Sequence, residues 1–434
     1  MERYKTYKDS GIEWIGEIPE HWEVKRLKYI GDSIIGITYS PKEVVQEGGT
    51  LVLRSSNIQN GKLSLKDTVY INKVIPERLE TRIGDILICS RNGSRRLIGK
   101  NITIDEKTEG ETFGAFMTVF RTEQYEFISK YFNSQVFSGQ SGLFLTSTIN
   151  QLTVNTLNNF YTALPPKKEQ DLIAKYLDKK TNEIDSLIEQ KKRLLKFYKD
   201  ESKVIINIAI TKGIIPEIEL KFSGIDWLGN IPKHWGISKL KYLLEVKDGT
   251  HDTPNYVVES EDSFPLITSK DLKTGIIKFA ECKYISREDY LEINKRSNVF
   301  RDDIIMPMIG TVGGAVIVRT ERPFSIKNVA LFKTSVRSVN ELYIKYLLDS
   351  DFVKQQFELE SRGGVQDFVS LSLLKNIIVF NISLEEQTKI GNHIENELKK
   401  INAKAKKTKK LISFLEEYKT VLISDVVTGK LKVT

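Results

Sequence analysis

Residues Ser10–Ile30 read SGIEWIGEIPEHWEVKRLKYI, and residues Ser223–Leu243 read SGIDWLGNIPKHWGISKLKYL. The two segments are identical at 12 of 21 positions at a constant offset of 213 residues, and both tryptophans of the first segment recur in the second. A period near half the chain indicates a duplicated domain, because solenoid repeats have periods of about 20 to 50 residues. The sequence therefore predicts a pseudo-dimer within one chain.

A second repeated block begins at Glu169–Gln170 and returns at Glu386–Gln387, an offset of 217 residues. Apolar residues follow both copies at steps of three, four or seven, which is the spacing of one helix face near the coiled-coil period, although Lys180 and Lys191 interrupt the first stripe. The first stripe is Ile173, Leu177, Ile184, Leu187, Leu194 and Tyr198, and the second is Ile390, Ile394, Ile401, Ala405, Ile412 and Leu415. We therefore expect two helices of about 35 residues, each about 50 Å long.

Between these repeated ends, residues 31–163 and 244–380 share only scattered correspondences. Both middles contain short β-branched and aromatic runs separated by Gly, Asn, Asp and Pro, which is typical of strands joined by turns. Runs such as Asp85–Cys89 and Ile304–Met306 predict strands, and Glu126–Phe137 and Asn340–Gln356 predict helices. The expected fold class is α+β, with lobes of mixed α/β structure.

Four segments follow from this organisation. We expect a first lobe at residues 1–163, a first spacer helix at 164–215, a second lobe at 216–380 and a second spacer helix at 381–434. Two equivalent helices can pack about a two-fold axis only when they run antiparallel, so we expect an antiparallel coiled coil. A helical hairpin that merely joins two domains would produce the same periodicity, and both interpretations stay open.

The chain of 434 residues has 65 Lys and Arg against 57 Asp and Glu, a formal net charge of +8. The excess is shared evenly, with 32 against 28 up to Glu217 and 33 against 29 after it. A basic chain suits a polyanionic partner, although charge alone is a weak signal. No apolar run approaches the roughly 20 residues of a membrane span, and the N-terminus lacks a secretory stretch, so we expect a cytoplasmic protein without a membrane partner.

The only two cysteines, Cys89 and Cys282, lie in apolar runs without a second Cys or a His at ligand spacing. This arrangement argues against a disulfide framework and against a zinc site. We predict two buried thiols and no metal site.

Several loops that follow predicted strands carry side chains suited to DNA. Arginine can pair with guanine O6 and N7, asparagine or glutamine with adenine N6 and N7, and a glycine backbone can approach a phosphate closely. The candidate DNA-binding residues of the first half are Arg54, Ser55, Asn57, Arg91, Asn92, Ser94, Arg95, Arg96, Thr148 and Asn150. Those of the second half are Ser269, Lys270, Thr311, Lys327, Asn328, Arg362, Gly363 and Gln366. Any one of these residues fits a solvated turn better, so the prediction rests on the clusters as wholes.

The repeated Trp and His residues allow two interpretations. Trp22 beside His21, and Trp235 beside His234, could stack on a base or bind a small molecule. Two tryptophans eight residues apart around a Pro turn favour packing of each lobe against the helix pair. We therefore predict a structural role for these aromatic residues.

Catalytic motifs do not fit the sequence. Gly93–Lys100 resembles a phosphate loop, but it has one residue too many between its glycines, and Asn101 stands where Ser or Thr would bind magnesium. Leu164–Pro166 lacks the Asn and the aromatic residue of an amino-methyltransferase site. Glu217–Lys221 only faintly resembles a nuclease core and lies between the halves. We predict no catalytic residues and no cofactor bound by this chain.

The repeated opening Ser-Gly-Ile-Glu/Asp-Trp-Ile/Leu-Gly-x-Ile-Pro-x-His-Trp and the Glu-Gln entry into each long helix resemble the specificity subunits of Type I restriction-modification systems. The resemblance covers essentially the whole chain. It implies a non-catalytic protein with two target-recognition domains, each of which reads one half of a bipartite site in double-stranded DNA. The antiparallel helices would then set the gap between the half-sites.

The resemblance also implies partners. Two modification subunits that use S-adenosylmethionine and two ATP- and Mg²⁺-dependent restriction subunits would assemble on this chain and carry the catalytic residues. The alternative is a duplicated, self-contained DNA methyltransferase or nuclease, which should transfer a methyl group or nick DNA when purified alone.

Overall fold

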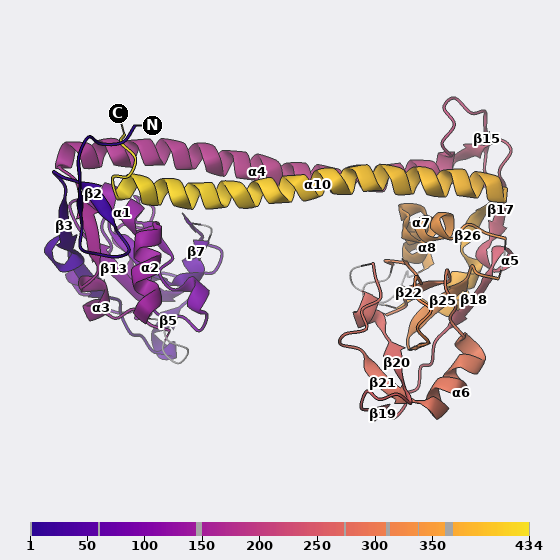
Figure 1. Cartoon of the computed structure of the whole chain (residues 1–434). Helices are drawn as coiled ribbons and strands as arrows, with labels where there is room; N and C mark the ends of the chain where they lie inside the picture. The colour runs from indigo at the N-terminus through magenta and orange to yellow at the C-terminus, as the bar shows by residue number, and fades with distance from the viewer. Residues whose placement is uncertain are drawn as a thin grey trace. The chain divides into compact units, whose positions relative to one another are not determined.

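Two long helices carry the second repeated block (Figure 1). In the computed structural model, α4 is Lys167–Lys212, with 46 residues, and α10 is Leu384–Val427, with 44 residues. The structure describes residues 2–59, 61–144, 150–272, 275–309, 313–336, 338–360 and 368–433. Both helices exceed the expected length of about 35 residues, because an α-helix continues through polar residues until a backbone signal ends it. Gly213, with a φ of 76°, directly follows α4.

The chain divides into two compact units, residues 1–192 with 410–434 and residues 193–409. The start of α4 and the end of α10 belong to the first unit, whereas the end of α4 and the start of α10 belong to the second. In the first unit Ile173 and Leu177 share a core with Val426. In the second unit Ile210 shares a core with Ile394. The two helices therefore pack antiparallel, as the sequence predicts.

The predicted helix stripe is wrong at one position. Leu187 is 37% exposed, and its neighbour Ile188 is 6% exposed and belongs to the core of the first unit. A straight helix has 3.6 residues per turn, so a stripe that follows Ile184 continues at a step of four. Further along the two helices the predicted stripe positions Leu194, Tyr198, Ala405, Ile412 and Leu415 are half-buried.

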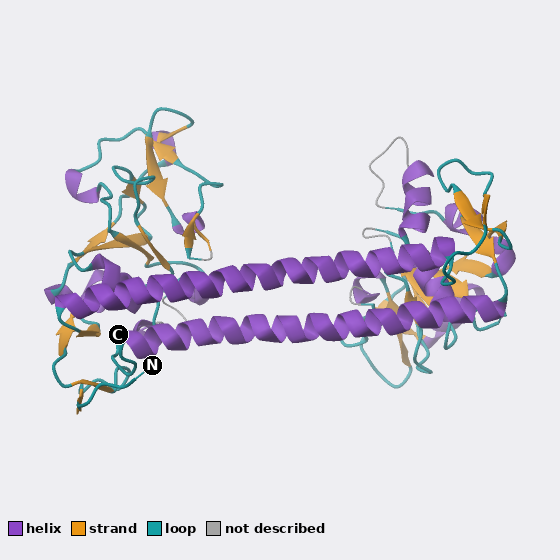
Figure 2. Cartoon of the chain, turned by 90° about the horizontal axis from the view of Figure 1, so that it is seen from above, coloured by secondary structure: helices purple, strands orange, loops and turns teal. Residues whose placement is uncertain are grey.

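Each unit contains two four-stranded sheets, and Figure 2 shows the strands in orange. In the first unit, the order of one sheet is β11-β10-β13-β4, and the order of the other is β12-β6-β9-β5. The first sheet is antiparallel, and in the second sheet β12 and β6 are parallel. The strands are β4 (Asp32–Ile35), β5 (Val44–Val45), β6 (Thr50–Leu53), β9 (Tyr70–Ile71), β10 (Ile86–Cys89), β11 (Asn101–Thr103), β12 (Thr112–Phe113) and β13 (Met117–Arg121).

The second unit repeats this topology strand for strand. Its sheet orders are β18-β25-β22-β23 and β19-β21-β20-β24, again with one parallel pair, β20 and β24. The strands are β18 (Glu245–Asp248), β19 (Tyr256–Val257), β20 (Ser263–Ile267), β21 (Lys283–Ser286), β22 (Ile304–Pro307), β23 (Val316–Ile317), β24 (Ser325–Ile326) and β25 (Val329–Lys333). The middles that differ in sequence therefore share one fold of mixed α/β structure.

Two-stranded pairs frame the sheets. The repeated openings form β1 (Tyr7–Asp9) with β2 (Glu17–Pro19) and β15 (Leu220–Phe222) with β16 (Asn230–Pro232). The strands before the long helices pair back to the openings, β14 (Tyr161–Leu164) with β3 (Glu23–Arg26) and β26 (Ile378–Asn381) with β17 (Gly236–Lys239). A hairpin of β7 (Ile58–Gln59) and β8 (Lys62–Leu63) lies in the first unit.

Each of the two predicted lobe helices is split in two. Residues 126–137 fall on α1 (Tyr125–Phe132) and α2 (Gln135–Phe144), and residues 340–356 fall on α7 (Glu341–Asp349) and α8 (Asp351–Glu360). The breaks coincide with Ser134 and Ser350, whose hydroxyls donate to the preceding helix at 2.6 Å and accept from the next one. Serine in this position competes with the helix backbone for hydrogen bonds, and apolar periodicity does not reveal that. The remaining helices are α3 (Val154–Asn158), α5 (Leu240–Leu243), α6 (Arg287–Ser297) and α9 (Leu371–Asn376).

The two repeated blocks meet at the start of each long helix. Trp22 is fully buried and donates from Nε1 to Glu169 at 3.1 Å, while His21 lies 2.7 Å from the same carboxylate. In the second unit, Trp235 is also fully buried and donates to Glu386 at 2.9 Å. The predicted structural role is confirmed for this pair of tryptophans.

The first tryptophan of each opening is less enclosed. Trp14 is 40% exposed and lies against Gly139, so the expected packing is only partial there. Trp227 is half-buried, with its ring 5.7 Å from that of Phe352.

In the part of the chain that the structure describes, no helix combines the length and the apolar character that a membrane crossing needs.

Candidate nucleic-acid interface

The first unit has a cleft of about 980 Å³ where β6 and β10 end. Two loops with predicted DNA-binding residues, Arg54–Asn57 and Arg91–Arg96, meet in its wall although 34 residues separate Asn57 from Arg91. The lining includes Thr38, Tyr39, Arg54, Ser55, Ser56, Asp67, Arg91, Asn92, Gly93, Phe116 and Asn150. Five of the predicted residues therefore share one surface.

Hydrogen bonds hold these loops in place. The Asn92 amide donates to Ser55 Oγ at 3.1 Å, and its carbonyl oxygen accepts from the Ser94 backbone at 3.0 Å. Lys100 donates to the Ser55 carbonyl and, at 2.8 Å, to that of Ile58. The ends of β6 and β10 are thus tied into one rigid wall, a requirement for precise recognition.

Asn57 does not reach the cleft. Its side chain is fully buried, where its oxygen accepts from the Arg54 backbone at 2.8 Å and its amide donates to the carbonyls of Ser64 and Asp67. The side-chain oxygen and nitrogen of Asn57 both bond the backbone of the surrounding turn. We therefore correct the prediction: Asn57 is a structural residue and not a DNA contact. Asp271 has the same function in the second unit, where it accepts from the backbone and the hydroxyl of Thr268 at 2.8 Å.

The guanidinium of Arg54 has one nitrogen with a hydrogen-bond partner and one without. One terminal nitrogen donates to Asp67 at 2.9 Å. Its Nε is buried without a hydrogen-bond partner among the described residues, as is Ser56 Oγ. Unpaired buried polar atoms are costly, so these two atoms are an unsatisfied feature of the protein beside the cleft.

Phe116 is a residue of this cleft that sequence reasoning missed. Its ring is 58% exposed, and the guanidinium of Arg91 lies 5.0 Å from the ring centroid. A cation placed over an aromatic face is partly fixed in position. The alternation of strand residues does not predict an exposed Phe directly before β13, so no sequence signal identified it.

Three further predicted residues lie next to the cleft and not in its wall. Ser94, Arg95 and Arg96 are exposed, and Arg95 donates to the Gly142 carbonyl at 3.1 Å. Asn150 donates to the Gly93 carbonyl at 3.3 Å and so connects a third chain segment to this loop.

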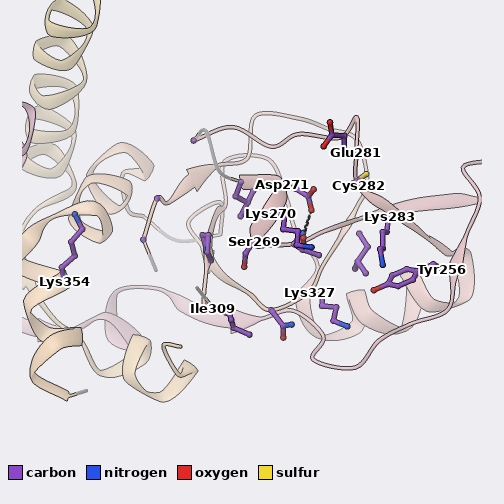
Figure 3. A pocket seen from close by; sticks show the side chains of 18 residues that line it. Tyr256, Ser269, Lys270, Asp271, Glu281, Cys282, Lys283, Ile309, Lys327 and Lys354 are labelled. Atoms are coloured by element: carbon purple, nitrogen blue, oxygen red, sulfur yellow. Dashed lines mark hydrogen bonds between the residues drawn. The ribbon is translucent and has the colours of Figure 1, made fainter. Parts of the chain in front are cut away.

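The second unit has a cleft of about 1230 Å³ in the equivalent place (Figure 3). Isolated bridges show the equivalence, because Ile37 pairs with Gly114 in the first unit as Thr250 pairs with Lys327 in the second. The lining includes the predicted residues Ser269, Lys270, Lys327 and Asn328, together with Tyr256, Asp271, Glu281, Cys282, Lys283, Ile309 and Lys354.

Lysines dominate the charge of the second cleft. Lys270, Lys283, Lys327 and Lys354 line it, against the carboxylates of Asp271 and Glu281. Figure 3 shows Lys283 beside Tyr256, with the ammonium 3.8 Å from the ring centroid. A concave, cationic surface attracts a polyanion. Lys283, Tyr256 and Lys354 were not among the sequence candidates.

The remaining predicted DNA-binding residues, Thr148, Thr311, Arg362, Gly363 and Gln366, lie outside the described residues. The two thiols differ, since Cys89 is buried and Cys282 is only half-buried in the second cleft, which corrects the expectation of two buried cysteines. Burial raises the pKa of the Cys89 thiol.

Within the described ranges, no group of three or more His, Cys, Asp or Glu residues could hold a metal ion.

Comparisons with known proteins agree with this duplicated architecture. The family model described as "Type I restriction modification DNA specificity domain" matches residues 19–196. A putative type I restriction enzyme specificity subunit, MjaX, from Methanocaldococcus jannaschii is 26% identical over 438 residues, covering 96% of this chain and 96% of that protein. The EcoKI specificity subunit of Escherichia coli K12 is 25% identical over 283 residues, which are 62% of this chain and 58% of that protein.

A solved structure, from work on the assembly and conformational transition of the type I R-M system, shares the fold. It covers 95% of this chain and 99% of the other, with a TM-score of 0.71 at 14% sequence identity. The duplicated chain thus has two polar clefts at equivalent places in its two units. This chain is similar along its length to specificity subunits of Type I restriction-modification systems, whose names state a specificity role and not a catalytic one.

Proposed function

We propose that this chain is the sequence-specific DNA-binding subunit of a Type I restriction-modification complex and that each cleft reads one half of a bipartite target. The observation that carries the proposal is the occurrence of two clefts at equivalent sites of two lobes with the same sheet order. Their lining residues differ, for example Arg91 in the first cleft and Ile309 in the second. A common scaffold with different linings suits two half-sites of different sequence.

The proposed recognition domains are residues 1–163 and 216–380, and the proposed spacers are residues 164–215 and 381–434. The spacers contain α4 and α10. Each residue of an α-helix adds about 1.5 Å to the length of the helix. In our proposal, the length of this helix pair sets the number of base pairs between the half-sites. DNA of a bacterium or an archaeon is the substrate, so the cytoplasm is the proposed place of action.

The proposed contacts in the first lobe are those that line or border its cleft. Arg54, Ser55, Arg91, Asn92 and Asn150 line it, and Ser94, Arg95 and Arg96 border it. In the second lobe they are Ser269, Lys270, Lys327 and Asn328. Arginine and asparagine supply the donors and acceptors that read base edges in the major groove, and lysine neutralises phosphates. Thr148, Thr311, Arg362, Gly363 and Gln366 remain candidates from the sequence.

The long helices offer a docking face for the proposed modification subunits. Phe197 of α4 and Phe414 of α10 are equivalent in the repeat and are 65% and 53% exposed. Exposed aromatic residues on a helix favour a protein partner. Since the face occurs twice, we propose that it binds two copies of one partner, the modification subunit with its S-adenosylmethionine. Two restriction subunits, which use ATP and Mg²⁺, complete the proposed assembly.

A lobe exchange tests the proposal. Residues 31–163 are replaced by the corresponding segment of another specificity subunit, and the methylome of cells that express the hybrid is sequenced. We expect the first half-site to change while the second half-site and the gap stay the same. The matched exchange of residues 244–380 should change only the second half-site. A first half-site that survives the first exchange would contradict the assignment.

The same proposal predicts that the purified chain has no enzymatic activity by itself. Methyl transfer should appear only after a modification subunit is added, and neither methyl transfer nor nicking should occur without it. Activity of the chain by itself would instead support a duplicated, self-contained methyltransferase or nuclease.

A further inference from the structure

A cluster of polar side chains lies beside the second cleft. Asp248, the last residue of β18, is 4% exposed, and its Oδ2 lies 2.8 Å from Nε2 of His251. Arg296 of α6 donates to the other carboxylate oxygen. On the far side of the imidazole ring, Nδ1 of His251 lies 2.9 Å from Oδ1 of Asn328. Both ring nitrogens of His251 are therefore engaged, one by a carboxylate and one by an amide.

The first lobe has different residues at these positions. The strand equivalent to β18 is β4, which ends at Ile35, and the equivalent bridges place Thr38 where the second lobe has His251. Ile35 is 50% exposed and neither residue carries a charge. The cluster therefore belongs to the second lobe and is not part of the shared scaffold.

Asn328 is held in a fixed place on the cleft wall. It lines the cleft, its backbone N–H donates to the Thr250 carbonyl at 3.1 Å, and its φ is 54°. A left-handed backbone is uncommon for a residue with a side chain and is often associated with functional sites. With its backbone fixed and one end of its amide bonded to His251, Asn328 has the other end left for the cleft.

The protonation state of His251 decides which end that is. A charged imidazole donates from both nitrogens, so Asn328 Oδ1 accepts from Nδ1 and its NH₂ group is left for a ligand. In the neutral ring, Asp248 retains the proton on Nε2, and Nδ1 becomes an acceptor. The amide must then turn over to donate from Nδ2, which leaves Oδ1 for a ligand.

We propose that His251 is a positioning residue for base recognition and that its proton selects which end of the Asn328 amide reads the second half-site. This inference rests on the proposed function, namely that the second cleft reads DNA. With charged His251, Asn328 offers a donor, which suits guanine O6 or thymine O4. With neutral His251, it offers an acceptor, which suits adenine N6 or cytosine N4.

The electrostatic surroundings favour the charged form. The hydrogen bond to Asp248, followed by that to Asn328, raises the pKa of His251 above its ordinary value of 6.5, although Arg296 opposes the shift. Asp248 and Arg296 are the charged groups that face the ring. Lys327, which precedes Asn328, donates to Thr253. Histidine is the side chain whose ordinary titration lies closest to neutral pH, so a moderate change of pH changes its charge.

The experiment is a selection from duplexes of randomised sequence. The full chain together with its modification subunit selects DNA at about pH 6, below the ordinary histidine pKa, and at about pH 9. We expect one position of the second half-site to change from guanine or thymine to adenine or cytosine. The preference should be roughly two- to ten-fold, the range that one neutral hydrogen bond provides.

Variants separate the roles of the two residues. His251→Asn should give the same preference at both pH values, and Asn328→Ala should lose the preference at this position at both. The first half-site reports correct folding of the His251 and Asn328 variants. Thr38→Asn, the matched change in the first lobe, should leave the second half-site and its pH response unchanged. A second half-site that is selected but does not respond to pH would overturn the inference alone. If no half-site is selected at all, the proposed function fails with it.

Discussion

The indole of Trp22 donates a hydrogen bond of 3.1 Å to the carboxylate of Glu169, and 147 residues separate the two in sequence. Trp235 and Glu386 repeat the contact at 2.9 Å in the second unit. Each pair joins the repeated opening motif to the first turn of a long helix. The parts of the sequence that are most alike in the two halves are therefore the parts that attach each lobe to its helix.

Replacing Glu169 with Gln should destabilise the first unit. The carboxylate accepts from Tyr4, His21 and Trp22, so we expect a loss of about 1 to 3 kcal/mol in the free energy of unfolding. Burial raises the pKa of Glu169, but the hydrogen bonds from these three side chains outweigh it and lower that pKa below 4.5. The carboxylate's contribution is thus complete above about pH 4.5 and is lost as the pH falls through the lowered folded pKa.

Urea unfolding of wild type and Glu169→Gln at several pH values measures this difference. Glu183→Gln is a matched control on the same helix, since Glu183 is exposed and bonds only Lys180 among the partners identified. If the free energy of unfolding falls equally in the two variants, the contact with Trp22 does not stabilise the protein more than an exposed ion pair does.

The Arg91→Ala variant should bind the specific site about 1 to 3 kcal/mol more weakly if Arg91 contacts bases. Competition binding against non-specific DNA measures the effect. Arg82→Ala, an arginine of the same lobe that does not line the cleft, should change binding little. Uniform weakening on all sequences would assign Arg91 to phosphates.

Removing the exposed ring of Phe116 tests the aromatic part of the same surface. Phe116→Ala leaves Arg91 without the ring over which its guanidinium lies. We expect weaker specific binding by about 0.5 to 1 kcal/mol with little change in the melting temperature, since the side chain is 58% exposed. A large fall in melting temperature would instead indicate a structural role.

Lys333→Met should strongly destabilise the second lobe. Lys333 and Asp303 are both buried and form an ion pair, so removal of one partner leaves an uncompensated buried charge. We expect a loss of about 3 to 5 kcal/mol by chemical unfolding. Lys295→Met, which removes an exposed pair with Glu292, should cost less than about 1 kcal/mol. Similar losses of unfolding free energy in the two variants would contradict the expectation that burial makes the Lys333–Asp303 pair costly to break.

The proposed docking face predicts a change of stoichiometry. Phe197→Asp should lower the complex from two modification subunits to one, and Phe197→Asp with Phe414→Asp should abolish binding, as measured by native mass spectrometry. Phe222→Asp is the control, because Phe222 is 58% exposed but lies on β15. Unchanged assembly of the double variant would exclude this face.

The raised pKa of His251 also predicts a pH effect on stability. The hydrogen bonds to Asp248 and Asn328 favour the charged ring, so its contribution is complete below pH 6.5 and is lost as the pH rises through the folded pKa. Wild type should lose slightly more stability than His251→Asn between about pH 6 and about pH 9. Because the side chain is 48% exposed, the difference should stay below about 1 kcal/mol. An identical pH profile of the two proteins in calorimetry would contradict it.

Much of the fold could be predicted because it depends on local pattern. Strands at 86–89 and 304–307 follow from their apolar runs, and the two long helices follow from a repeated stripe. Other features depend on contacts distant in sequence. Nothing near Asn57 indicates that its amide bonds the carbonyls of Ser64 and Asp67, and the exposure of Phe116 depends on how β13 begins.

The sequence by itself determined the duplication and the antiparallel helix pair, because repeats and helical periodicity are properties of residue order. Only the tertiary structure revealed that the dissimilar middles share one sheet topology and that loops separated in sequence meet in two equivalent clefts. It also brought Asp248, His251 and Asn328 together. The physical reason is that a cleft forms where strands distant in the chain pair side by side, and hydrogen bonding between strands is compatible with many different side chains.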